Sequence, residues 1–363
     1  MKSRWSDAEA SGLSPLDLLA YASRLIGAEA SLVVWGGGNT SLKVSERDFG
    51  GREVRVLRVK GSGSDLKSIT RKDFPGVRLE EILALLERDE MGDQEMVEYL
   101  AHALQQLAGP RPSIETLLHG FLPFEAVIHT HADAIVSLTN MDRCAEVLRE
   151  VYGPAVVTIP YRRPGFLLSK DVARAVREHP EAMAVILEKH GTIHWGHTIK
   201  DAYLATIDLV SKTEETIHEK LKGRRPFGAS RMPALGSEAR REVVLAVAPL
   251  LRGVVSRHRR AILSFDDSPD VLEFVGSAEA ATLSQVGPAT PDHTIYTKRL
   301  PCFVPLERPA DPDHVKARVR EAVERFAADY SAYFEANRFE GATLLDPFPR
   351  VVLMPGLGMF TTG

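Results

Sequence analysis

The stretch VIHTHADAI, residues 127–135, places two histidines one residue apart within an apolar run that is typical of a β-strand. Residues two apart in a strand point to the same face, so we expect His129 and His131 to present their imidazoles side by side. One zinc ion needs its histidine nitrogens at about 2.0–2.1 Å from a common centre, and this spacing allows that. The pair alone fits equally well a half-exposed strand that alternates histidine with threonine.

Strands and helices alternate around this stretch. The pair Ser14–Pro15 predicts a helix start, because a serine cap before proline satisfies free amides of the first turn. β-rich and apolar segments predict strands at 31–35, 40–44, 52–61, 125–131 and 181–189, and helical patterns predict helices at 79–89, 94–108, 113–122, 170–178 and 200–221. This order predicts a layered α/β domain, and its early hairpin-like strands favour a mixed sheet.

A segment rich in Gly, Pro and Arg at 222–237 is the best candidate for a linker. Beyond it we expect a helix near 238–253, short strands around 260–276, a strand with charged edges within 290–301, and a long helix over 312–337. A functional alternative for that charged run is contact with an anionic substrate through Asp292, His293, Lys298 and Arg299.

The composition excludes several classes of protein. A formal net charge of −4 from interspersed acids and bases leaves no basic field for nucleic acid. No apolar run approaches the roughly 18 residues of a membrane helix, and no signal peptide begins the chain. The two cysteines, Cys144 and Cys302, are isolated, which argues against a disulfide framework or a thiolate metal cluster. We therefore expect a cytoplasmic protein that binds neither membrane nor nucleic acid.

Two further residues could complete a metal site. His190 follows an apolar strand and precedes Gly191, and strand ends in α/β domains are where sites gather. Glu115 lies in the first turn of the helix predicted at 113–122, where the helix dipole favours a carboxylate whether or not it has a function. The functional alternative is that Glu115 touches the metal or acts as a general base. His119, four residues on, could orient that carboxylate, although a core or surface role is equally simple.

Two glycine-rich loops offer an anion site. The segments WGGGNTS at 35–41 and KGSGSDL at 60–66 expose backbone amides and hydroxyls that can cradle a phosphate. Each alone is also typical of a hairpin turn, with Asn39 left-handed and Ser64 or Asp65 capping a helix. Together with Ser113 they would place an anion end opposite the metal end.

The order GNTS, SG, PSxE, HTH and HG…WG resembles the class II aldolase/adducin family over about residues 16–222, and five elements occur in the family's order. The resemblance implies a three-layer α/β/α domain with a central mixed, mainly antiparallel sheet. It further implies zinc, or another divalent transition metal, on His129, His131, His190 and Glu115, with Glu115 also the catalytic acid/base. The phosphate and substrate contacts that it implies are Gly38, Asn39, Ser62, Gly63 and Ser113.

Two features refine this resemblance. Sugar-phosphate aldolases often have two serines before the glutamate, whereas Ile114 follows Ser113 here, so one phosphate hydroxyl is missing. The region 223–363 resembles the C-terminal part of the aldolase half of bacterial rhamnulose-1-phosphate aldolase/short-chain dehydrogenase fusions. We expect it to form an α/β extension that packs on the catalytic domain at 16–222. The glycine loop near 355–363 then reads as an interdomain junction.

The expected function is zinc-dependent cleavage of a ketose 1-phosphate, such as L-rhamnulose 1-phosphate, to dihydroxyacetone phosphate and a short aldehyde such as L-lactaldehyde. Alternatives on the same metal scaffold are a sugar-phosphate epimerase or a dehydratase. Adducin-like members that lack the ligands are non-catalytic binding proteins, and the four ligands here argue against that class. The family also implies a homotetramer and a tyrosine donor from a neighbouring subunit. Tyr152 and Tyr161 lie in the right part of the chain for that donor, but a core or surface role is the simpler interpretation of each.

Overall fold

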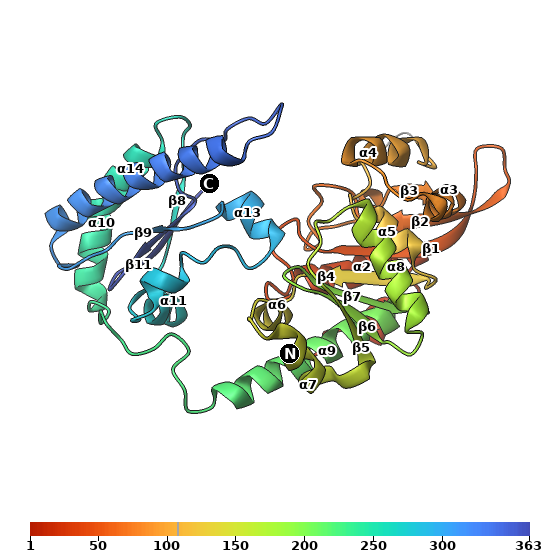
Figure 1. Cartoon of the computed structure of the whole chain (residues 1–363), viewed down its shortest axis with the longest axis horizontal. Coiled ribbons are helices and arrows are strands. Elements are labelled where there is room, and N and C mark those ends of the chain that lie inside the picture. Colours follow the sequence, from red (N-terminus) through yellow and green to blue (C-terminus); the bar gives the residue numbers. More distant parts are fainter. Residues whose placement is uncertain (107–108) are drawn as a thin grey trace. The chain divides into compact units, whose positions relative to one another are not determined.

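The computed structural model describes residues 1–106 and 109–363, with the side chain of Pro291 outside the description. It contains two units, Met1–Lys220 and Leu221–Gly363. In the first unit, the strand that carries His129 is the centre of a seven-stranded sheet with the order β3-β2-β1-β4-β7-β6-β5 (Figure 1). Its strands are β1 Asn39–Arg47, β2 Glu53–Val59, β3 Gly76–Arg78, β4 Ala126–Thr130, β5 Val156–Ile159, β6 Ala184–Leu187 and β7 Gly191–Gly196.

Only β5 and β6 pair in parallel, and the other neighbours in this sheet are antiparallel. Helices cover both faces of this sheet. One core cluster joins the sheet to α2 Pro15–Gly27, α6 Asp133–Thr139, α7 Cys144–Tyr152 and α9 Ile199–Leu221. The other core clusters of this unit contain residues of α3 Leu79–Ala84, α4 Asp93–His102, α5 Thr116–Phe121 and α8 Phe166–Glu178. The short α1 spans Asp7–Ala10, and single 3₁₀ turns occupy Arg71–Asp73, Leu85–Glu87 and Gly153–Ala155. The predicted three-layer fold with a mixed, mainly antiparallel sheet is confirmed.

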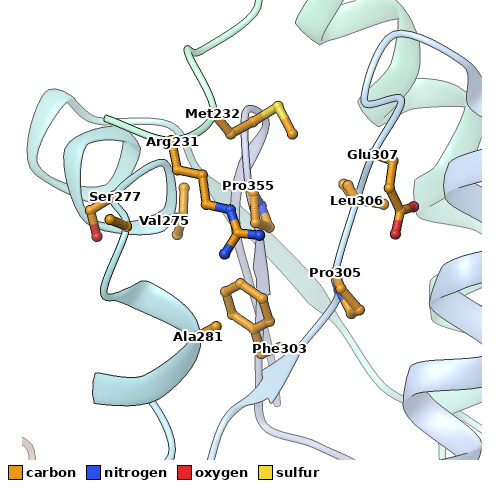
Figure 2. Close-up of a pocket in the computed structure, with 11 residues that line it drawn as sticks. Arg231, Met232, Val275, Ser277, Ala281, Phe303, Pro305, Leu306, Glu307 and Pro355 are labelled. Atoms are coloured by element: carbon orange, nitrogen blue, oxygen red, sulfur yellow. The ribbon is translucent and has the colours of Figure 1, made fainter. Parts of the chain in front are cut away.

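The second unit has a four-stranded sheet of the order β8-β11-β10-β9. Its strands are β8 Leu263–Asp266, β9 Cys302–Phe303, β10 Val351–Met354 and β11 Gly358–Thr362, and its helices are α10 Ser237–Val255, α11 Pro269–Val275, α12 Ala280–Leu283, α13 Pro291–Thr297 and α14 Pro312–Asn337. Residues of α10, α14 and the sheet form one apolar core, and a cavity lies beside β9 (Figure 2). The expected α/β extension is confirmed.

Several predicted elements are wrong. Residues 31–35 form turns instead of a strand, although Leu32 and Val33 are buried and the Leu32 carbonyl accepts the N–H of His131 at 3.1 Å. The run at 290–301 contains a helix, α13, and the second half of 260–276 contains α11. In each case hydropathy alone did not determine the backbone.

Other boundaries moved. The helix predicted at 94–108 ends at His102, and residues 107–108 lie outside the described residues. Helix α5 begins at Thr116, so Glu115 immediately precedes the first turn instead of lying within it. In the described part of the chain, we find no helix with both the length and the apolar character needed to cross a membrane.

Candidate metal and substrate site

The candidate residues gather because of how three strands pair. Strand β4 runs antiparallel to both of its neighbours, β1 and β7, so the end of β4 meets the beginnings of the other two. Asn39, the first residue of β1, is paired with His129, and Thr130 is paired with Thr192 of β7. His190 lies one residue before β7. Residues that are far apart in the sequence are thereby brought to one edge of the sheet.

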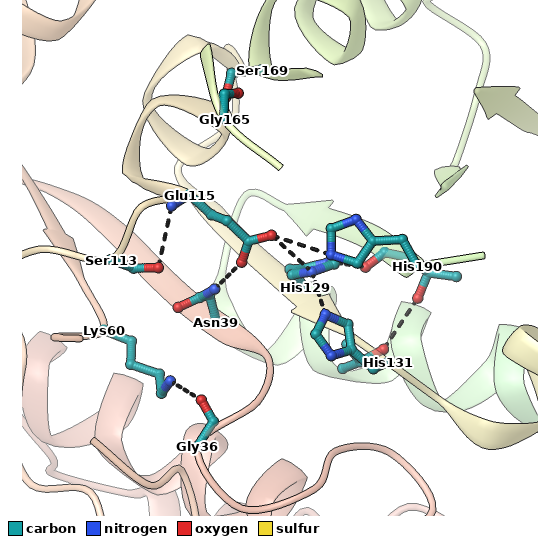
Figure 3. Close-up of polar contacts among 12 residues, drawn as sticks. Gly36, Asn39, Lys60, Ser113, Glu115, His129, His131, Gly165, Ser169 and His190 are labelled. Carbon is teal, nitrogen blue, oxygen red and sulfur yellow. Dashed lines mark hydrogen bonds and ion pairs between the residues drawn. The ribbon is translucent and has the colours of Figure 1, made fainter. Parts of the chain in front are cut away.

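The three histidines form a buried cluster at this edge. His129, His131 and His190 are 0%, 7% and 2% exposed, and their ligand nitrogens all lie within 4.8 Å of one another. The Nε2 atoms of His129 and His131 are 2.9 Å apart, which confirms that the two imidazoles lie side by side. In Figure 3 the rings of the three histidines converge on one point, with the Glu115 carboxylate beside them.

The backbone around the cluster fixes how the rings point. His129 donates Nδ1–H to the Thr192 carbonyl at 2.8 Å, so its Nε2 is the ring nitrogen that faces the cluster. A side chain at Gly191 would place its Cβ 2.1 Å from the Thr130 carbonyl oxygen, so only glycine allows β7 to begin this close to β4. Lys189, with φ of +57°, makes the turn that delivers His190.

Glu115 connects the cluster to Asn39. Its Oε1 lies 3.4 Å from Nε2 of His129 and 3.4 Å from Nε2 of His190, while Oε2 accepts a hydrogen bond from the Asn39 amide. Asn39 begins β1 with an extended backbone, so the alternative of a left-handed turn residue is wrong. Its Oδ1 is buried without a partner among the described atoms, and such an acceptor is suited to a ligand donor.

The carboxylate remains ionised in this setting. Burial by itself would raise the pKa of Glu115, but the charge of His129 and hydrogen bonds to His129 and His190 hold that pKa well below 4.5. A buried, ionised carboxylate among imidazoles accepts hydrogen bonds and can serve as a metal ligand.

These residues fit a divalent metal ion. Ligand atoms that share a tetrahedral zinc ion at about 2.0–2.1 Å lie about 3.3 Å apart. The 3.4 Å separations between Glu115 and two of the histidine nitrogens match that spacing, and the 2.9 Å separation between His129 and His131 is somewhat shorter. Imidazole nitrogens with a carboxylate oxygen are donors that zinc and neighbouring transition metals accept.

Of the residues expected at the anion end, Gly38 and Ser113 lie beside this cluster. Gly38 is buried with φ of +64°, and a Cβ there would come within 2.9 Å of the His129 carbonyl oxygen. Ser113 is 8% exposed, and its hydroxyl accepts the backbone N–H of Glu115 at 3.2 Å. Ser62 and Gly63 are exposed, and the N–H of Ser62 binds the Arg111 carbonyl at 2.7 Å, so their loop runs alongside the segment that leads to Ser113.

Lys60 is a residue of this site that was not predicted from the sequence. This lysine is 3% exposed, and its ammonium donates to the Gly36 carbonyl at 2.6 Å, beside Asn39 and Ser113 in Figure 3. It follows the last residue of β2, and its N–H binds the Thr40 carbonyl at 3.1 Å, so it lies at the same sheet edge. A lysine directly before a glycine loop was the available signal. Its positive charge favours an anion at this end of the site.

The remaining candidates make other contacts. His119 is buried and hydrogen-bonded to Ser41 at 2.8 Å, and burial together with the charge of His129 lowers its pKa to about 3. Tyr152 is buried against Thr213, whereas Tyr161 is 55% exposed. In the second unit, Thr290 hydrogen-bonds His293, Lys298 lies over the Tyr330 ring and Arg299 over that of Tyr333, and Asp292 is buried.

Comparison with known proteins agrees with this geometry. Residues 17–215 match the family described as class II aldolase and adducin N-terminal domain, and residues 242–363 match the family described as aldolase class II, second domain. The N-terminal class II aldolase domain of a conserved protein from Thermoplasma acidophilum is 43% identical, with a TM-score of 0.56, over 60% of this chain and 99% of that one.

A Bacillus subtilis (strain 168) protein described as uncharacterized oxidoreductase YuxG is 42% identical over 365 residues, which are 100% of this chain and 53% of that protein. The chain therefore spans about half the length of this relative, which agrees with the expected likeness to one half of a fusion protein. The L-fuculose-1-phosphate aldolase of Thermus thermophilus is more distant, at 19% identity and a TM-score of 0.37 over 56% of this chain and 96% of that one. This likeness carries no information about the substrate. From the match over residues 17–215, more than half of its length, the chain belongs to the class II aldolase and adducin family.

Proposed function

We propose that this chain is a metal-dependent aldolase that cleaves a ketose 1-phosphate, with L-rhamnulose 1-phosphate as the favoured substrate. The products are dihydroxyacetone phosphate and a short aldehyde, here L-lactaldehyde. The observation that carries the proposal is the buried cluster of His129, His131 and His190 with Glu115 at 3.4 Å from two of them. These four residues argue against an adducin-like binding protein, a class that lacks the ligands.

The metal in this proposal is zinc, or another divalent transition metal, held by the three histidines and, in the resting enzyme, by Glu115. When bound, it supplies Lewis-acid polarisation of the substrate carbonyl. The buried position of the histidines excludes water from around the reacting atoms, which strengthens every electrostatic interaction there. The Thr192 carbonyl keeps the His129 ring in the required orientation.

Glu115 moves the protons in the proposed reaction. As the bond between the third and fourth carbons breaks, its electron pair stays with the three-carbon fragment and the fourth carbon becomes the aldehyde. The hydroxyl proton of that carbon goes to the Glu115 carboxylate and returns to the third carbon. The Asn39 amide, bonded to Oε2, holds the carboxylate in place, and proton transfer by a positioned side chain contributes about 10²–10⁴ to such rates.

The phosphate lies at the other end of the proposed site. Gly38, Asn39, Ser62, Gly63 and Ser113 supply amides and hydroxyls, and Lys60 adds a buried positive charge. Ile114 is 40% exposed and supplies no hydroxyl. The ammonium of Lys60 offsets that missing contact, because a charged donor binds phosphate more strongly than a neutral one.

A retro-aldol assay tests the proposal. The purified chain is incubated with L-rhamnulose 1-phosphate, and dihydroxyacetone phosphate is measured before and after treatment with a chelator and after zinc is restored. We expect cleavage that disappears with the metal and returns with it. Undiminished cleavage by metal-free protein, or conversion to an epimer or a dehydrated product instead, would overturn the assignment.

The organisation of the chain is part of the same proposal. Residues 16–222 form the catalytic domain in this proposal, and residues 223–363 form an α/β extension. A homotetramer in the cytoplasm with sites completed at subunit boundaries is expected, with light scattering of the purified chain as the check. A monomer with full activity would contradict it.

A further inference from the structure

A cavity of about 190 Å³ lies within the second unit, apart from the proposed aldolase site. Its walls come from the segment before α10, the residues that follow α11, the beginning of α12, the strand β9 with the residues after it, and the turn between β10 and β11. Figure 2 shows the Arg231 guanidinium extending into the space between Val275, Phe303 and Pro355.

The walls are mostly apolar. Eight of the lining residues are Met232, Val275, Ala278, Ala281, Phe303, Pro305, Leu306 and Pro355. Of the polar ones, the Ser277 hydroxyl donates to the Phe274 carbonyl at 2.7 Å, and the Glu307 carboxylate lies 3.0 Å from His314 Nε2. Across the described residues, no carboxylate pairs with Arg231, and the Glu307 carboxylate lies beside His314 instead, so the Arg231 guanidinium is the positive charge that the lining residues offer.

The backbone holds Arg231 in place at this wall. Its N–H and that of Met232 both bind the Gly276 carbonyl, at 2.8 and 2.9 Å, and Ser230 bridges to Ser277. A Cβ at Gly276 would lie 2.5 Å from the Met232 carbonyl oxygen, so the two segments can approach this closely only with glycine there. The base of the Arg231 side chain is thus fixed while its guanidinium remains available.

We propose that this cavity binds a small organic monocarboxylate with a compact aliphatic or aromatic body, held by Arg231. Guanidinium matches a carboxylate with two parallel hydrogen bonds, and apolar walls favour a body without hydroxyls. Ligand sites are commonly apolar pockets with a few placed polar groups. A cavity of about 150 Å³ holds a benzene-sized molecule, so the body of a branched five-carbon acid fits the present volume.

The sugar phosphate of the proposed reaction does not suit this cavity. Its hydroxyl groups would lose their hydrogen bonds to water against walls such as Val275 and Phe303, which costs free energy for each unpaired group. A dianionic phosphate would meet a single positive charge. Binding of an acid here is therefore independent of the proposed function, and either can fail without the other.

The test is a titration of the full chain with 3-methylbutanoate, followed through the methionine methyl signals in NMR spectra. We expect a saturable shift at Met232, none at Met141 of the first unit, and binding of 3-methylbutan-1-ol about tenfold weaker, since the alcohol lacks the charge that Arg231 binds. Inorganic phosphate should bind more weakly than the acid.

Three variants decide which feature of the cavity binds the acid. Arg231→Met should reduce binding of the acid to the level of the alcohol, while Arg224→Met, a change of charge in the same linker, should leave it unaltered. Ala281→Phe retains the guanidinium but fills the cavity, and should abolish the shift.

Four results would each overturn the proposal: equal binding of acid and alcohol, full binding by Arg231→Met, tighter binding of phosphate, or no saturable shift. A Met232 signal that changes with protein concentration before any acid is added would indicate a second copy of the chain in the cavity, and would also overturn it.

Discussion

The seven-stranded sheet buries polar side chains along one edge, whereas the four-stranded sheet of the second unit packs against an apolar core. At the first edge lie Asn39, Glu115, His129, His131 and His190, each at most 8% exposed. The core of the second unit is built from residues such as Val247, Leu251, Val319, Val323 and Val352. Burying polar groups costs free energy unless they find partners, so a polar cluster is retained only where it does something besides packing.

This difference between a polar sheet edge and an apolar core separates the contribution of each region to folding from its contribution to function. Both sheets are stabilised by apolar contacts with helices, and those contacts explain the fold without explaining a function. The ends of β4 and β7 add histidine nitrogens that lie within 4.8 Å of one another, and β1 adds Asn39 beside them. The second unit offers instead an apolar cavity into which Arg231 extends, which suits binding better than chemistry.

The largest expected effect is the loss of a histidine ligand. His190→Ala should reduce the metal content of the protein and lower kcat/KM by about a thousandfold or more, because several kcal/mol of charge stabilisation are lost. His197→Ala, at an exposed histidine, is the matched control and should leave both unchanged. Metal analysis and the cleavage assay are the measurements. Full metal content in His190→Ala would break the assignment of the cluster.

Glu115→Gln should lower kcat by about a hundredfold or more, because the amide keeps the shape of the side chain but accepts no proton. Glu125→Gln, at a half-exposed carboxylate paired with Arg55, is the control and should retain activity. Steady-state kinetics measure both variants. Activity in Glu115→Gln close to that of the native chain would remove this residue from the proton transfers.

Lys60→Met should raise KM for a phosphorylated substrate about tenfold with a smaller change in kcat. The charged hydrogen bond to the phosphate is lost from the bound substrate and from the transition state alike. Lys67→Met, at an exposed lysine a few residues on, should change neither parameter. The comparison of the two variants is informative only with the phosphorylated substrate. An unchanged KM would separate Lys60 from the anion end.

The smallest effect is on stability in acid. Burial lowers the pKa of His194 to about 3 from an unfolded value of 6.5, so below pH 6.5 the unfolded chain binds a proton that the folded chain does not. The free energy of unfolding should therefore fall by about 1 kcal/mol per pH unit between pH 6.5 and 5 on account of this residue.

His194→Phe should weaken that dependence on pH, and His258→Phe, at an exposed histidine of the second unit, should not. Denaturant unfolding at several pH values is the measurement. An equal slope in His194→Phe and the native chain would show that His194 is protonated when folded.

Much of the fold and the cluster could be predicted from the sequence. The serine and proline that start α2 predicted that helix correctly. The same signal precedes α11 as Ser268–Pro269 and α13 as Thr290–Pro291, where hydropathy instead suggested strands. Proline at the first helical position was the better guide at both, because its fixed φ suits the first turn whichever side chains are apolar, although neither Ser268 nor Thr290 makes a side-chain capping hydrogen bond.

Only part of the site could be predicted from the sequence, and the reason is physical. The spacing of His129 and His131 follows from the period of a strand, which the sequence contains. That Asn39 and Lys60 reach the same edge depends on the order β2-β1-β4-β7, which is a property of long-range pairing. No local pattern encodes that order, so the buried charge of Lys60 became visible only in the folded chain.

The central claim is that His129, His131 and His190 hold one metal ion at the edge of the larger sheet. X-ray absorption at the zinc edge, on the purified chain supplied with one equivalent of zinc, tests it most directly. The account predicts a site of histidine nitrogens and carboxylate or water oxygens at about 2.0–2.1 Å, without sulfur, that is lost in His190→Ala and kept in His197→Ala. A spectrum of hydrated zinc, or one that His190→Ala leaves unchanged, would contradict it.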